Sequence, residues 1–155
     1  GCLLASKREQ DSFIVTESGG FVPKQHAAPL SFLESDPVEV AARFVGTPYL
    51  WGGKTSAGLD CSALVQLALQ STGYECPRDS DMQQKVGVHV PFNGDNSLLR
   101  SGDLIFWKGH VGFYAGAGML LHANAFHMAV AQEPLSAAIE RIRASGSEVL
   151  EVRRI

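Results

Sequence analysis

Four short segments rich in strand-forming residues follow one another within residues 103–131, and this spacing is the strongest constraint on the fold. The segments are Asp103–Trp107, His110–Ala115, Met119–His122 and Met128–Ala131. The turns at Lys108–Gly109 and Gly116–Gly118 are too short for a crossover connection, so successive strands have to pair antiparallel. The sequence therefore predicts an antiparallel meander.

Helical patterns lie before and after this meander. Asp36 and Pro37 are typical of an N-cap and a first helical residue, and the helix that they begin is predicted to end at Gly46. The apolar residues of its expected inner face are Val38, Ala41, Ala42 and Val45. A second helix is predicted over Ser62–Gln70 from its apolar stripe. Because helices come first and an antiparallel sheet follows, the fold class is α+β.

Two further elements are expected near the end of the chain, a helix over Leu135–Arg143 and a last strand over Glu148–Arg153. The first 33 residues differ from the rest, because Ser12–Thr16 and Phe21–Pro23 flank a turn and predict a β-hairpin. A lone hairpin buries too little surface to be stable. We therefore divide the chain into residues 1–33, part of a β module with a linker, and residues 34–155, the main domain.

Composition excludes several classes of function. The net charge is -3 with no cluster of Lys and Arg, so no nucleic-acid partner is expected. No apolar run approaches the roughly 20 residues of a membrane span, so no membrane partner is expected. Three cysteines cannot all pair within one chain, which favours free thiols and a reducing compartment, the cytoplasm.

Cys61 has the setting of a nucleophile. A glycine-containing loop, Gly58–Asp60, delivers it to the first turn of the second predicted helix. The helix dipole and free backbone N–H groups there would lower the pKa of the thiol and favour the thiolate. The alternative is a small buried apolar residue, which is the usual role of a free cysteine and the expected role of Cys2 and Cys76.

Two histidines are candidates for the base. His110 begins one predicted strand and His122 ends the next, so in an antiparallel pair both lie near the same end of the sheet. A cysteine and a histidine oriented by a third polar group form an activated nucleophile. Each histidine could instead be a structural residue. His26 and His89 are expected on the surface, and His127 could either line the site or pair across the sheet.

The order of four motif blocks resembles the NlpC/P60 family of cysteine peptidases. The blocks are residues 46–53, 60–66, 102–107 and 110–114. The resemblance implies a papain-like α+β fold and cleavage of bacterial cell-wall peptides, with Cys61 as nucleophile, His110 as general base and His122 as its orienting residue. It also implies that the Tyr49 hydroxyl helps to hold the oxyanion and that Trp51 contacts substrate. Ala63 departs from the glycine usual in the family.

Residues 77–83 carry a finer resemblance, to the γ-D-glutamyl-L-diamino acid endopeptidases, which are similar to dipeptidyl-peptidase VI. In that subgroup SH3-like domains precede the catalytic domain, and the hairpin of residues 1–33 resembles the end of such a domain. Asp79 and Ser80 match a pair that binds the free amino terminus of L-Ala, because a carboxylate and a hydroxyl can hold an ammonium. The alternative is that Asp79 caps a helix.

The resemblance thus implies hydrolysis of the γ-D-Glu–diamino acid bond of a murein peptide through a thioester, with no metal and no organic cofactor. The diamino acid is either meso-diaminopimelate or lysine. One alternative is an amidase or acyltransferase with the same cysteine and histidine. Another is a catalytically silent or zinc-binding module that uses Cys61, His110 and His122 as ligands.

Overall fold

The computed structural model describes residues 2–155. These form two compact units, and the boundary along the chain falls between Leu33 and Glu34. In the first unit, strand β1 (Ser6–Gln10) pairs with β2 (Phe13–Thr16), and β2 pairs with β3 (Phe21–Pro23), all antiparallel. A 3-10 turn, η1 (Lys24–His26), follows. The hairpin of β2 and β3 was expected from the sequence, and β1 was not. That this unit is the remnant of an SH3-like module stays a prediction.

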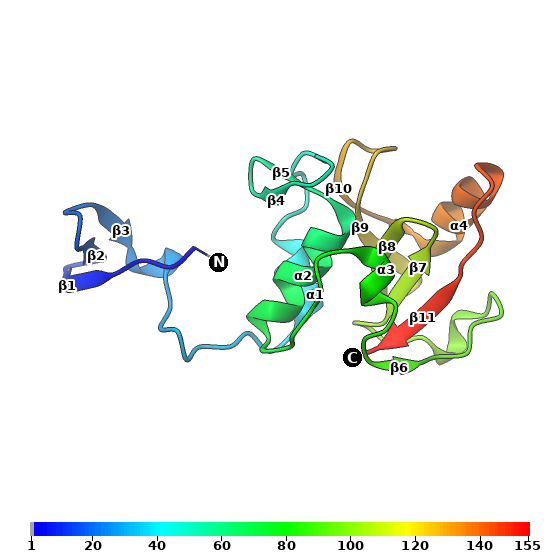
Figure 1. The fold of residues 1–155 in the computed structure, drawn as a ribbon, viewed down its shortest axis with the longest axis horizontal. Helices are drawn as coiled ribbons and strands as arrows, with labels where there is room; N and C mark the ends of the chain where they lie inside the picture. The colour runs from blue at the N-terminus through cyan, green and yellow to red at the C-terminus, as the bar shows by residue number, and fades with distance from the viewer. Residues whose placement is uncertain (1) are drawn as a thin grey trace. The chain divides into compact units, whose positions relative to one another are not determined.

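The second unit contains a six-stranded antiparallel sheet in the order β10-β9-β8-β7-β11-β6 (Figure 1). Its strands are β6 (Val88–His89), β7 (Leu104–Trp107), β8 (His110–Gly116), β9 (Met119–Asn124), β10 (Ala129–Pro134) and β11 (Glu151–Arg154). The strands from β7 to β10 are the meander that the turn spacing predicts. The last strand of the chain does not extend the meander, because β11 pairs with the opposite edge of β7.

Four helices and a small ribbon complete this unit. They are α1 (Pro37–Ala42), α2 (Cys61–Ser71), α3 (Ser80–Gln83), α4 (Leu135–Ala144) and the ribbon of β4 (Lys54–Thr55) with β5 (Gly58–Leu59), and a 3-10 turn, η2 (Asn96–Leu98), precedes β7. Within residues 2–155, no helix has both the length and the apolar character needed to cross a membrane.

Alternation along the strands gives the sheet two buried faces. On β7, Leu104 and Phe106 pack in the cluster that includes α1 and α2, whereas Ile105 and Trp107 pack in the cluster that includes α4. Figure 1 accordingly shows α2 on one side of the sheet and α4 on the other. A strand buried on both faces is continuously apolar, which explains the run Leu104–Trp107.

Helix α1 is shorter than the sequence predicts. Asp36 caps it as expected, accepting hydrogen bonds from the N–H groups of Val38 and Glu39 at 2.7 and 3.4 Å. The helix ends at Ala42, however, so Val45 lies beyond it and is exposed, and Ala42 is also exposed. The predicted inner face was therefore wrong for these two residues.

Helix α2 anchors the second unit, and its apolar stripe is buried as predicted. Leu64 is fully buried between the helix and the sheet. Leu64→Ala should therefore lower the free energy of unfolding by about 2–5 kcal/mol, the range for a buried leucine whose site relaxes only in part. Urea denaturation monitored by circular dichroism measures this change.

Leu98→Ala is the matched control, because Leu98 is exposed. It should change the free energy of unfolding by no more than about 0.5 kcal/mol. Equal stabilities of the two variants would contradict the packing of α2 against the sheet.

Candidate active site

Cys61 is the first residue of α2, and Asp60 before it is the N-cap. The Asp60 carboxylate accepts hydrogen bonds from the backbone N–H groups of Ala63 and Gly52, each at 2.8 Å. One carboxylate therefore caps the helix and holds the loop that precedes it. This fixes the position of the Cys61 backbone relative to residues 50–53.

Arg78 adds a third segment to this arrangement. Its guanidinium donates to both oxygens of Asp60, at 2.9 and 2.6 Å, and to the Ser62 hydroxyl at 2.8 Å. Burial alone would raise the pKa of Asp60, but the hydrogen bonds from Arg78, Ala63 and Gly52 outweigh it and the pKa is lowered. The start of α2 is thus tied by a charged pair to the segment that leads into α3.

The Cys61 thiol is 7% exposed and lies against β8. Burial raises its pKa, and the N–H groups of Val111, Ser62 and Cys61 itself oppose this rise only in part. The expectation of a lowered thiol pKa at the helix start was therefore wrong, because desolvation outweighs the helix terminus. The effect of the Val111 N–H also places the sulfur near the residue that follows His110 on β8.

His110 and His122 meet as the strand positions predict. His110 Nε2 lies 2.8 Å from His122 Nδ1, and His122 is fully buried. Gly112 follows His110 by two residues on β8 and lies against β9, and a Cβ there would come within 2.9 Å of Leu120 and 3.0 Å of His122 Cβ. The glycine is therefore needed for the strands to bring the two rings together. Trp107 packs against His110 with ring centroids 5.6 Å apart.

Both histidines are neutral at neutral pH. Burial lowers the pKa of His110 to about 3, and electrostatic repulsion from His122 and Arg141 contributes to the decrease. Burial likewise lowers the pKa of His122 to about 4, although Glu133 opposes the change. With the thiol pKa raised and the imidazole pKa lowered, the resting pair is a thiol and a neutral imidazole. The arrangement therefore suits proton transfer to His110 during attack better than a preformed ion pair.

Two residues of the site were missed by sequence reasoning, Glu133 and Arg141. Glu133 Oε1 lies 2.8 Å from His122 Nε2, and Arg141 donates to both oxygens of Glu133 at 2.6 Å. The ring of Phe126 covers the Arg141 guanidinium at 4.2 Å. Glu133 lies beyond the predicted strand Met128–Ala131, so the local pattern gave no signal, and its partner could be identified only from the register of β9 with β10.

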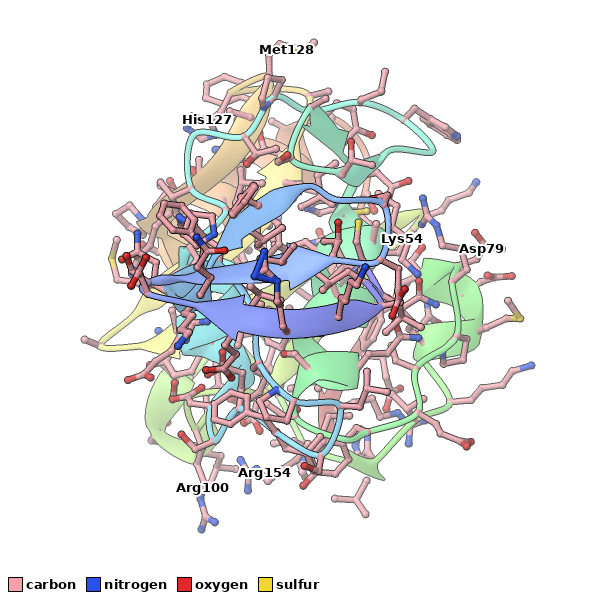
Figure 2. All side chains as sticks on the ribbon, turned by 90° about the vertical axis from the view of Figure 1, so that its left-hand side faces the viewer. Lys54, Asp79, Arg100, His127, Met128 and Arg154 are labelled. Atoms are coloured by element: carbon pink, nitrogen blue, oxygen red, sulfur yellow. The ribbon has the colours of Figure 1, made fainter. Side chains whose placement is uncertain are left out.

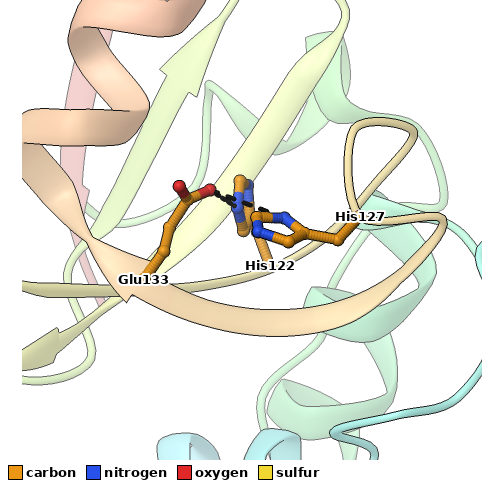
Figure 3. Close-up of side chains that lie close together, drawn as sticks. All are labelled: His122, His127 and Glu133. Carbon is orange, nitrogen blue, oxygen red and sulfur yellow. Dashed lines mark hydrogen bonds and ion pairs between the residues drawn. The ribbon is translucent and has the colours of Figure 1, made fainter.

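Three side chains in this region, His122, His127 and Glu133, are spaced closely enough to hold a metal ion (Figure 3). Both ring nitrogens of His122 already have hydrogen-bond partners, and both Glu133 oxygens accept from Arg141. A metal ion here would have to displace these bonds. The donor set fits a hydrogen-bond network better than a ligand set, and it differs from the cysteine and two histidines that the zinc alternative requires.

Tyr49 and Trp51, the two aromatic residues of the first motif block, differ in their surroundings. Burial raises the pKa of the Tyr49 hydroxyl, and the charges of Cys61 and Asp60 raise it further, which places the hydroxyl near the nucleophile. Trp51 is 87% exposed. Tyr49 is therefore close enough to Cys61 for the two groups to influence each other electrostatically, whereas the Trp51 side chain is exposed.

Asp79 and Ser80 stand at the start of α3. Asp79 occupies the N-cap position, but its side chain makes no capping hydrogen bond and is exposed (Figure 2). The cap alternative for Asp79 therefore has no hydrogen bond to support it. Arg78, next to Asp79, donates to Asp60 and Ser62, the residues on either side of Cys61, so the segment that leads into α3 lies close to the start of α2.

A cavity of about 310 Å³ opens beside the histidine pair. Its lining combines His110, Arg141 and apolar groups of Phe126 and Ile142.

The NlpC/P60 family pattern matches residues 46–144. A curated relative, the γ-D-glutamyl-L-lysine dipeptidyl-peptidase of Bacillus subtilis (strain 168), is 38% identical over 114 residues, which are 66% of this chain and 37% of that protein. A solved NlpC/P60 family protein from Bacillus cereus ATCC 10987 superposes with a TM-score of 0.71 at 28% identity, covering 97% of this chain and 53% of that one. The peptidoglycan hydrolase RipB from Mycobacterium tuberculosis gives 0.62 at 32% identity, covering 77% and 62%. The chain spans less than two thirds of each of these three proteins.

Cys61 and Cys76 offer a matched test of the base, because both are free and 7% exposed. Burial raises the pKa of Cys76 to about 11. Iodoacetamide at neutral pH should alkylate Cys61 faster than Cys76, since Cys61 lies beside the strand that carries His110, the candidate base. In His110→Ala the rate at Cys61 should fall to about that at Cys76. Peptide mapping by mass spectrometry measures both rates, and equal rates in the unmodified protein would contradict the assignment of the base.

Proposed function

The chain belongs to the NlpC/P60 family, and from this we propose that it is a cysteine peptidase that hydrolyses the γ-D-Glu–diamino acid bond of murein peptides. One observation carries the proposal. A buried cysteine at a helix start lies beside the strand that carries His110, and His110 is hydrogen-bonded to His122 at 2.8 Å. This is the arrangement of an activated nucleophile with an oriented base.

In the proposed route His110 removes the proton from the Cys61 thiol as sulfur attacks the carbonyl carbon of the γ-amide. The tetrahedral intermediate collapses when the C–N bond breaks, and His110 gives its proton to the leaving amine. Water then attacks the thioester with His110 again as base, and the C–S bond breaks to release L-Ala-γ-D-Glu and restore the thiol. The proposed route needs no metal and no organic cofactor.

Negative charge on the carbonyl oxygen needs hydrogen-bond donors in the intermediate. The backbone N–H of Cys61, at the free start of α2, is one donor in the proposal. The Tyr49 hydroxyl is the second, and its raised pKa keeps it protonated and able to donate. His122 acts in this scheme through His110, as the group that orients the ring.

The amino terminus of the substrate would be bound by Asp79 and Ser80. An ammonium needs oxygen acceptors, and the Asp79 carboxylate is one that no capping bond engages. Asp79 is exposed in the free chain, so the desolvation that makes such a pair selective has to come from the bound peptide or from further protein. The name of the Bacillus subtilis relative, a γ-D-glutamyl-L-lysine dipeptidyl-peptidase, supports the same bond.

The test is the cleavage of L-Ala-γ-D-Glu-diaminopimelate and of its N-acetyl form, with products identified by mass spectrometry. The free peptide should yield L-Ala-γ-D-Glu, and Cys61→Ala should yield nothing from either peptide. A charge-assisted hydrogen bond contributes about 1.5–3 kcal/mol, so acetylation should lower kcat/KM by roughly 10- to 100-fold.

Asp79→Asn should remove most of this preference for the free amine. Asp81→Asn is the matched control, since Asp81 is a neighbouring exposed carboxylate that accepts a hydrogen bond from the N–H of Met82 in its own helix. It should keep the preference. Cleavage of a different bond, or product from Cys61→Ala, would contradict the proposed function. Equal rates on both peptides would contradict the role of Asp79 alone.

A further inference from the structure

Strand β10 brings Glu133 to the ring of His122. Ala131 pairs with His122 across the two strands, and Glu133 lies two residues further on, so its side chain is on the same face of the sheet. Glu133 is only 8% exposed. Arg141 of α4 covers it with two hydrogen bonds of 2.6 Å, and His127 Nδ1 lies 3.8 Å from it.

Glu133 is charged despite its burial. Desolvation acts to raise its pKa, but hydrogen bonds from Arg141 and His122 outweigh this and the pKa is lowered. A carboxylate has no proton to donate and can only accept hydrogen bonds. The group that faces His122 Nε2 at 2.8 Å is therefore an obligatory acceptor.

This acceptor determines where each proton lies along the chain of rings. A neutral imidazole has one N–H and one bare nitrogen. Because His122 Nε2 must donate to Glu133, His122 Nδ1 is bare and accepts from its neighbour. The neighbour is His110 Nε2, 2.8 Å away, which must carry the proton. His110 Nδ1 is then the bare nitrogen, free to accept a proton from the Cys61 thiol.

We infer that Glu133, held by Arg141, is a positioning residue that sets the tautomers of His122 and His110 and so makes His110 Nδ1 the base. The inference rests on the proposed function only for its kinetic consequence. The tautomers themselves follow from the hydrogen bonds and can be measured without a substrate. Trp107, packed on the His110 ring, helps to hold the orientation that the hydrogen bond selects.

Glu133→Gln tests the role by reversing the chain. Arg141 donates to both oxygens of Glu133 and His122 Nε2 faces Oε1, so the amide loses one Arg141 bond in either orientation. With its oxygen at the Oε2 position, its NH₂ group faces His122 Nε2. His122 would become an acceptor at Nε2 and a donor at Nδ1, and His110 would carry its proton on Nδ1. We expect kcat to fall by about 10²- to 10⁴-fold with little change in KM, the range for loss of a general base.

Nitrogen-15 NMR of the imidazole rings gives a readout that a purely structural role would not move. His110 Nδ1 should be unprotonated in the wild type and protonated in Glu133→Gln. Arg141→Lys keeps a cation beside Glu133, so it should keep the wild-type tautomers and lose less than about 10-fold in kcat. Glu148→Gln is the matched control. Glu148 pairs at 3.0 Å with Arg143, which lies on α4 as Arg141 does, but Glu148 is exposed. The substitution should change neither quantity.

Three results would overturn the inference. The first is a wild-type His110 that carries its proton on Nδ1, which decides the matter even if Glu133→Gln does not fold. The second is a folded Glu133→Gln in which the tautomers are reversed but kcat is nearly normal. The third is a Glu133→Gln that loses activity while both rings keep their wild-type tautomers. A wild-type protein that leaves the peptide uncleaved would instead contradict the proposed function, and the NMR result would stand.

Discussion

The contact between the first turn of α2 and strand β8 is the interaction on which the site depends. It brings the Cys61 sulfur beside the N–H of Val111, one residue after His110. The apolar stripe of α2 supplies the packing energy, and Asp60 with Arg78 fixes where the helix begins. If the helix were displaced along its axis by one turn, about 5.4 Å, no proton could pass directly between the two side chains.

Burial gives this pair a different electrostatic character from the one that a helix terminus alone would produce. The helix start and its N–H groups favour a thiolate, but removing the thiol from water has the larger effect. The same desolvation keeps His110 neutral. In the proposed mechanism the thiolate therefore forms only as His110 takes the proton during attack on an electrophile.

The sequence predicted those features that depend on short stretches of chain. The cap at Asp36, the stripe of α2 and the meander each follow from neighbouring residues, and the meander placed His110 and His122 together. The pairing of β11 with β7 could not be predicted, because it joins segments about 45 residues apart. Glu133 was missed for a related reason.

The role of Glu133 depends on the register of β9 with β10 and on the docking of α4, neither of which the local pattern specifies. The same holds for the direction of the thiol pKa, which follows from the depth of burial rather than from position in a helix.

The central claim is that Cys61 becomes acylated by the γ-D-glutamyl group, and a trapped intermediate tests it most directly. L-Ala-γ-D-Glu with a p-nitroanilide leaving group should acylate Cys61 as p-nitroaniline leaves, and the thioester is present during turnover. Acid quenching during turnover, followed by peptide mapping, should find the L-Ala-γ-D-Glu adduct on Cys61. Release of p-nitroaniline with no adduct on Cys61, or with the adduct on another residue, would contradict the account.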